Sequence, residues 1–157
     1  QTSQTQISAV GDRGGRLPLT PVAIAEGQAV AKTIYQQQPT TVDLRWIPSA
    51  VFGFPPVATV GWSEATARER CGTENIGTKC QTFTSMENTL MDSPMPTQIK
   101  WVFDMTTDQI LGVHIAGHNA PEIVQGLVPA LRQGLTRNQQ QSTIGIHPTA
   151  AEELFSS

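Results

Sequence analysis

A histidine and a glutamate near the end of the chain have the spacing of an acid–base pair. In "TIGIHPTAAEEL", residues 143–154, His147 precedes a proline and stands five residues before Glu152. A turn at Pro148 would bring the Glu152 carboxylate onto the imidazole, orient the ring and favour its protonated form. The same letters also form a capping box, in which Thr149 and Glu152 cap a final helical turn. Spacing alone leaves both roles open.

The other reactive side chains give weaker signals. The sequence has no GxSxG serine motif, and Cys71 and Cys80 lie nine residues apart without a CxxC pair or neighbours that would activate a thiol. We expect two reduced thiols, with a disulfide as the alternative. His114 and His118 have the i, i+4 spacing of helical metal ligands, but they fall on a predicted strand and the turn after it. We therefore predict no metal site.

A second group of candidate residues lies in "ISAVGD" and "LTPVAIAEG", near the start of the chain. Asp12 ends a predicted strand over residues 7–12 and could accept hydrogen bonds from a hydroxylated ligand. Thr20 is a predicted N-cap and Pro21 suits the first turn, so a helix is expected over residues 21–35. The free N–H groups and positive dipole end of that helix suit an anionic or electron-rich ring. An ordinary strand, loop and helix that bind no ligand would explain the same residues equally well.

Length and composition limit the class of protein. The chain has 157 residues, which suits one domain, or one domain with part of another. With a net charge of −3 and no cluster of Lys or Arg, we expect no binding to nucleic acid. No apolar run approaches the roughly 20 residues of a membrane helix, and the polar start is unlike a signal peptide, so a cytoplasmic protein is expected. Because apolar "ISAV" follows only six polar residues, the chain reads as a fragment of a longer one.

The pattern from about residue 45 onward predicts an α+β fold, an antiparallel β-sheet with flanking helices. Apolar stretches bounded by turn residues predict strands over residues 49–52, 57–62, 77–83, 98–104 and 109–117. Helices are predicted over 64–71, capped by Ser63, and over 121–135, which Pro129 interrupts. A short strand over 142–146 should lead to the histidine of the acid–base pair. The segment before the sheet then looks like the final strand and helix of another domain.

Six motifs, in this order and at this spacing, resemble the C-terminal third of the flavin-dependent pyridine nucleotide-disulfide oxidoreductases. They are "ISAVGD", "LTPVAIAEG", "IPSAVF", "PPVATVGWSE", "ILGVHIAGHNAPEIVQG" and "TIGIHPTAAEEL". The resemblance implies that residues 1–44 end an FAD-binding domain and that residues 45–157 form the interface domain of a homodimer. The chain lacks a GxGxxG motif and a CxxxxC redox pair. Alone, it is therefore expected neither to hold FAD or NADPH tightly nor to reduce a disulfide.

The resemblance also implies roles for residues of this chain. Asp12 matches the aspartate that binds the ribityl chain of the flavin. Leu19 and Thr20 match the helix start whose N–H groups face the flavin pyrimidine, where the helix dipole stabilises the negative charge of reduced flavin. His147 and Glu152 match the acid–base pair that reaches into the active site of the partner subunit. The family's substrate-facing positions correspond to Thr84, Met86 and Glu153.

The choice of subfamily depends on a few positions. Two glutamates in "HPTAAEEL" are more similar to glutathione reductase than to dihydrolipoamide dehydrogenase, and the C-terminal cysteine pair of mercuric reductase is missing. Gln28 stands where glutathione reductases usually have an arginine, which trypanothione reductase also lacks. The resemblance thus implies an NADPH- and FAD-dependent reductase of glutathione disulfide, with trypanothione or another small disulfide as the alternative. A free-standing dimerisation module without catalysis is a further alternative.

Overall fold

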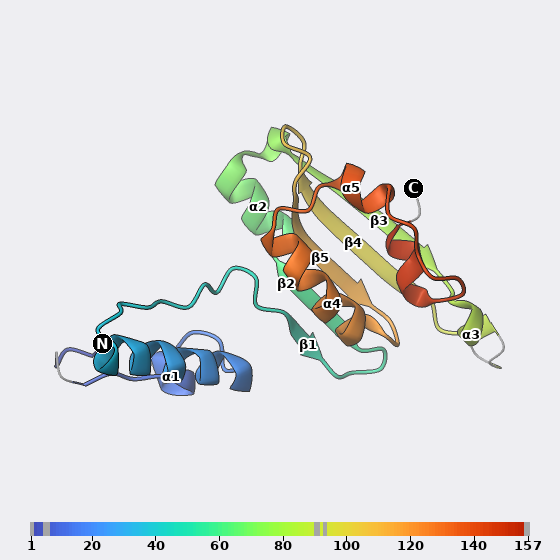
Figure 1. The fold of residues 1–157 in the computed structure, drawn as a ribbon. Coiled ribbons are helices and arrows are strands. Elements are labelled where there is room, and N and C mark those ends of the chain that lie inside the picture. Colours follow the sequence, from blue (N-terminus) through green and yellow to red (C-terminus); the bar gives the residue numbers. More distant parts are fainter. Residues whose placement is uncertain (1, 5–6, 90–91, 93, 156–157) are drawn as a thin grey trace. The chain divides into compact units, whose positions relative to one another are not determined.

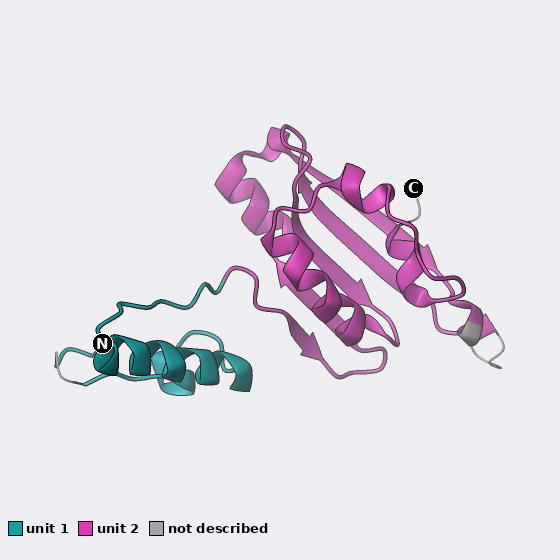
Figure 2. Cartoon of the chain, in the orientation of Figure 1, with its two compact units in different colours: residues 1–44 teal, residues 45–157 magenta. Residues whose placement is uncertain are grey.

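The computed structural model describes residues 2–4, 7–89, 92 and 94–155, apart from the side chain of Glu87. Within it the chain divides into two compact units, residues 1–44 and residues 45–157 (Figure 2).

The first unit is one long helix with a loop folded onto it. Helix α1, Thr20–Tyr35, buries Val22, Glu26 and Ala29. A 3-10 turn, Gly11–Gly14, precedes the helix. The helix starts one residue earlier than predicted, because Leu19 has the extended backbone of an N-cap and Thr20 is already helical. The prediction of Thr20 as a side-chain cap is therefore wrong.

The predicted strand over residues 7–12 is also wrong. Residues 7–10 have no strand assignment, and residues 11 and 12 belong to the 3-10 turn. Ile7 is 56% exposed and Val10 is 38% exposed. The described residues of the first unit include no second strand, so the apolar segment has no hydrogen-bonding partner with which to form a sheet.

The second unit is built on one antiparallel sheet with the strand order β1-β2-β5-β4-β3 (Figure 1). Its strands are β1 Ser49–Val51, β2 Val57–Gly61, β3 Ile76–Phe83, β4 Thr97–Asp104 and β5 Ile110–Ala116. All five lie within one residue of the predicted positions, and β4 and β5 pair as expected. The predicted α+β class, an antiparallel sheet with flanking helices, is confirmed.

Helices cover both faces of this sheet. They are α2 Glu64–Cys71, α3 Met86–Thr89, α4 Ala120–Arg132 and α5 Arg137–Gln141, with 3-10 turns over Thr73–Asn75 and Ala150–Leu154. The cluster that includes Trp101 packs with α4, whereas the cluster that includes Val102 packs with α2. Successive strand residues point to opposite faces, so α4 and α2 lie on opposite sides of the sheet. No helix in the described part of the chain has both the length and the apolar character to span a membrane.

The segment after α4 differs from the prediction. Helix α4 ends at Arg132, with Pro129 inside it, and the unpredicted helix α5 follows, capped by Thr136. The predicted strand over residues 142–146 is absent. Ile144 is 95% exposed and Ile146 is 77% exposed, so the described residues of the unit leave these apolar side chains largely uncovered. An alternating pattern predicts a strand only where a neighbouring strand is available.

Candidate functional site

Glu152 holds His147 and caps the last turn of the chain at the same time. The two carboxylate oxygens, Oε1 and Oε2, each lie 3.0 Å from Nδ1 of His147. The hydroxyl of Thr149 accepts the Glu152 N–H at 3.2 Å, and the Thr149 N–H donates to Oε1 at 3.3 Å. The capping box is confirmed, and the pairing of His147 with Glu152 occurs in the same geometry. The two interpretations of the sequence are therefore compatible.

The backbone around this pair is anchored on both sides. After the pair, Leu154 is 3% exposed and joins the α4 side of the core. Before it, Gly145 passes so close to Glu152 that a Cβ at this position would lie 2.8 Å from the glutamate Cβ. Between these points, the Thr149 hydroxyl donates to the Ile146 carbonyl at 2.7 Å. The backbone that carries the His147 imidazole is therefore held in place on both sides.

The histidine faces solvent while its carboxylate partner is partly covered. The side chain of His147 is 71% exposed, and that of Glu152 is 24% exposed. Because the carboxylate lies against Nδ1, Nε2 is the nitrogen left to meet another molecule. An imidazole held in this way can give or take a proton at Nε2. The arrangement can serve as half of an acid–base site if another molecule or segment brings the reacting group.

The second glutamate is held by a residue that sequence reasoning missed. Gln81 Nε2 donates to Glu153 Oε2 at 3.1 Å, across 72 positions of sequence. Gln81 belongs to β3, and Thr84 and Met86, both exposed, follow at the end of that strand. The bond links the C-terminal turn to β3, and Figure 1 shows this red segment lying along the strand. No local pattern marks Gln81, since its role depends on a contact that is remote in sequence.

The predicted flavin-side residues all belong to the first unit. Asp12 is exposed in the 3-10 turn, just before α1. Leu19, the N-cap of α1, offers no side-chain hydrogen bond to the first turn. An exposed carboxylate in the turn that precedes α1, and the uncapped, positive end of this 16-residue helix, are groups that fit a ligand with hydroxyl groups and an electron-rich ring. The residues present are thus chemically suited to a flavin.

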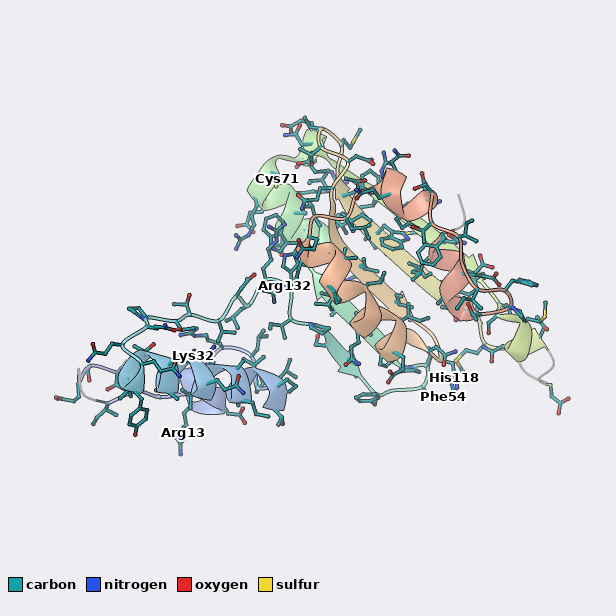
Figure 3. The ribbon with its side chains drawn as sticks, in the orientation of Figure 1. Arg13, Lys32, Phe54, Cys71, His118 and Arg132 are labelled. Atoms are coloured by element: carbon teal, nitrogen blue, oxygen red, sulfur yellow. The ribbon has the colours of Figure 1, made fainter. Side chains whose placement is uncertain are left out.

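His114 has its two nitrogens occupied inside the fold. Nδ1 bonds the Thr59 hydroxyl, and Nε2 lies 3.2 Å from the Trp62 carbonyl oxygen, to which it can donate. Burial lowers the pKa of His114, and the nearby Lys100 ammonium lowers it further, while the bond to the Trp62 carbonyl opposes the shift. His118 is exposed in the turn after β5, at the same end of the sheet as Phe54 (Figure 3). These two histidines do not share a site.

The other possible metal ligands and the two thiols lie apart in the described part of the chain. Among the residues that the structure describes, no three His, Cys, Asp or Glu side chains gather as metal ligands. Cys71 and Cys80 are both free thiols.

Comparison with known proteins gives one consistent result. Residues 47–156 match the family model described as "Pyridine nucleotide-disulphide oxidoreductase, dimerisation domain". The chain is 44% identical to a protein of Pisum sativum named "Glutathione reductase, chloroplastic/mitochondrial", over 98% of this chain and 28% of the relative. It is 40% identical to a "Glutathione reductase" of Nostoc sp., again over 98% of this chain, and 34% of that relative.

A third relative, a "Glutathione reductase" of Yarrowia lipolytica, is 34% identical over 98% of this chain and 33% of its own length. The chain thus spans about a third of the length of these curated relatives. The matched family model covers nearly the whole second unit, which carries the sheet and the His147–Glu152 pair. The chain belongs to the pyridine nucleotide-disulphide oxidoreductase family, of which it contains the dimerisation domain.

Proposed function

We propose that this chain is the C-terminal part of an NADPH- and FAD-dependent glutathione-disulfide reductase that works as a homodimer. The pairing of His147 with Glu152 is the observation that carries the proposal, because it is an acid–base pair without a reacting group of its own. In this proposal residues 1–44 complete an FAD-binding domain, and residues 45–157 form the interface domain. The dimer would then bring the pair to thiols on the partner subunit. A cytoplasmic location is part of the same proposal.

The first unit would bind the flavin, and bound FAD would supply the transfer of two electrons. The Asp12 carboxylate would accept hydrogen bonds from the ribityl hydroxyls. The positive end of α1, at Leu19 and Thr20, would face the pyrimidine edge and stabilise negative charge there. The Leu19 N–H donates to the Leu17 carbonyl at 2.8 Å, so Thr20 would supply the first free N–H group.

The second unit would move the proton. His147 would protonate the departing substrate thiolate from Nε2 and take the proton back in the reverse step. Glu152 keeps Nδ1 engaged and balances the charge of the protonated ring. Without that partner, the exposed ring would be free to turn away from the thiols.

Three exposed or partly exposed positions would meet the disulfide substrate: Thr84, Met86 and Glu153. The names of the relatives favour glutathione disulfide over trypanothione as that substrate. Gln28, which replaces the usual arginine, would then bind the substrate without charge pairing.

The test is the substitution His147→Ala in the complete reductase. Removing a general acid–base group should lower turnover by about 10² to 10⁴, while the FAD content stays at that of the parent. His118→Ala, which alters an exposed histidine in the turn after β5, serves as the matched control. A His147→Ala enzyme whose turnover stays within about threefold of the parent would contradict the assignment.

A further inference from the structure

We propose that Glu26 is a positioning residue for the flavin, because its buried carboxylate fixes the Asp12 loop onto α1. The proposal rests on the proposed function, in which Asp12 and the start of α1 bind the two ends of the flavin. Glu26 itself would touch neither the cofactor nor the substrate. It would set the spacing between the two groups that do.

A hydrogen bond joins the loop to the helix. The Gly11 N–H donates to Glu26 Oε2 at 2.8 Å, across 15 positions of sequence. Glu26 is 8% exposed, which is unusual for a glutamate in the middle of a helix. The amide that it accepts belongs to the residue directly before Asp12. Any movement of this bond therefore moves the aspartate.

The loop lies flat on the helix at this point. Gly11 has a φ of +65°, and a Cβ there would lie 3.1 Å from the Cβ of Ala23. Ala23 and Glu26 are three residues apart and therefore share one face of α1. The small side chain of Ala23 lets the loop backbone approach, and the carboxylate of Glu26 then captures its amide. These two contacts, both on one face of α1, thus set the distance between the loop and the helix.

Packing alone does not hold the loop in place. A cavity of about 200 Å³ lies beside the carboxylate, lined by residues 8–10, Arg16, Glu26 and residues 40–42 among others. Arg16 Nη1 lies 3.8 Å from Glu26 Oε1, and the arginine side chain is 60% exposed. Burying a carboxylate against one amide and one half-solvated guanidinium is costly, so an apolar residue would pack here with less penalty. The hydrogen bond to Gly11 is the feature that an apolar residue could not supply.

The decisive comparison is between Glu26→Met and Glu26→Gln in the complete reductase. Methionine has a similar size but a poor acceptor, whereas the glutamine amide oxygen can still accept the Gly11 N–H. Two quantities are measured: the Kd for FAD, by reconstitution of apoenzyme followed through flavin fluorescence, and hydrogen exchange of the peptide that contains Gly11. Lys32→Ala, an exposed change on the same helix, is the control, and Asp12→Ala, which removes the acceptor, is the reference for the flavin contact.

We expect Glu26→Met to weaken FAD binding about 10- to 100-fold and to speed exchange at Gly11 by a similar factor, as for an amide that is left without its hydrogen-bond acceptor. Glu26→Gln should stay within about threefold of the parent in both quantities. Lys32→Ala should leave both unchanged. If Glu26→Met does not fold, Glu26→Ala replaces it with the same expectation.

Two results would overturn the inference. The first is parental FAD affinity in Glu26→Met together with weakened affinity in Asp12→Ala, because the proposed flavin site would then stand without any role for Glu26. The second is an equal loss of FAD affinity in Glu26→Met and Glu26→Gln. Such a result would show that the site needs the charge of Glu26 and not its hydrogen bond to Gly11. Parental affinity in Asp12→Ala would instead overturn the flavin contact of Asp12 itself, and with it the positioning role of Glu26.

Discussion

Glu152 shows how a single carboxylate serves the fold and the chemistry together. Oε1 lies against both His147 and the Thr149 N–H, and Oε2 lies against His147 alone. The capping hydroxyl of Thr149 holds the Glu152 backbone, and the glutamate backbone in turn sets the direction of the carboxylate. A change at Thr149 should therefore alter both the stability of the fold and the position of the His147 imidazole.

Replacing Thr149 by valine tests this dependence. Valine keeps the branched shape but cannot accept the Glu152 N–H, so the free energy of unfolding should fall by about 1 kcal/mol, the usual cost of a lost N-cap. In the complete enzyme, turnover should fall as well, because Glu152 would no longer be held against His147. Urea denaturation and steady-state rates measure the two effects. Thr106→Val, in the exposed turn between β4 and β5, is the control, and equal behaviour of the two variants would contradict the coupling.

His114 should make the stability of the second unit depend on pH. Its pKa is lowered, first by burial and then by Lys100, which itself pairs with Glu64 at 2.7 Å. The unfolded chain, with a histidine pKa of about 6.5, therefore binds the proton more readily than the folded one. The contribution to stability is complete above about pH 6.5 and is lost progressively below it.

The measurement is the free energy of unfolding of the 157-residue chain at pH 7.5 and 5.5. The parent should lose stability between these values, and His114→Gln, which cannot take up the proton, should lose less. Identical pH slopes in the parent and the variant would show that His114 does not titrate as inferred.

At the scale of the elements, the sheet depends on close backbone contact where β2 ends. A Cβ at Gly112 of β5 would lie 2.1 Å from the Trp62 carbonyl oxygen, whereas a Cβ at Gly126 in α4 would meet nothing within 4 Å. Gly112→Ala should therefore cost about 1–3 kcal/mol or more through overpacking. Gly126→Ala should be neutral or add up to about 1 kcal/mol through helix propensity. Chemical denaturation of both variants checks the contrast, and equal stability would contradict it.

Elements whose partners lie within the chain were predictable from the sequence. Strands β4 and β5 have apolar patterns and a short turn between them, and Ser63 caps α2 as predicted. The predicted strands over residues 7–12 and 142–146 are also apolar, but they have no pairing partner among the residues that the structure describes. An apolar pattern indicates that a segment can be buried, but it does not identify the segment that packs against it. Helix α5 was not predicted because its residues are polar and form no apolar stripe at helical spacing.

The candidate site divides in the same way. The contact between His147 and Glu152 is local, so spacing suggested it, and spacing also suggested the capping box. Gln81 and Glu26 act through contacts with residues far away in sequence, so no motif could reveal them. The contact between neighbouring residues could thus be predicted from the sequence, whereas Gln81 and Glu26 could be identified only from the fold.

At the scale of the whole molecule, the proposed function makes each active site a shared property of two subunits. The chain contains the His147–Glu152 pair but no cysteine pair of the CxxxxC type. In a symmetric dimer, each subunit would then give its histidine to the partner and receive the partner's histidine in return. Such a site can be rebuilt from two inactive parents, and a site contained within one subunit cannot.

Subunit mixing distinguishes these two arrangements. One parent carries His147→Ala, and the other keeps His147 but lacks a redox cysteine in the part of the reductase outside this chain; each homodimer should be nearly inactive. After equal amounts are unfolded and refolded together, about half of the dimers should be mixed, each with one intact site, which restores about a quarter of the parental activity. If histidine and thiols act within one subunit, no dimer in the mixture has an intact site. Activity no higher than that of the separate homodimers, with mixed dimers verified by mass spectrometry, would therefore rule out the proposed placement of His147 in the partner's site.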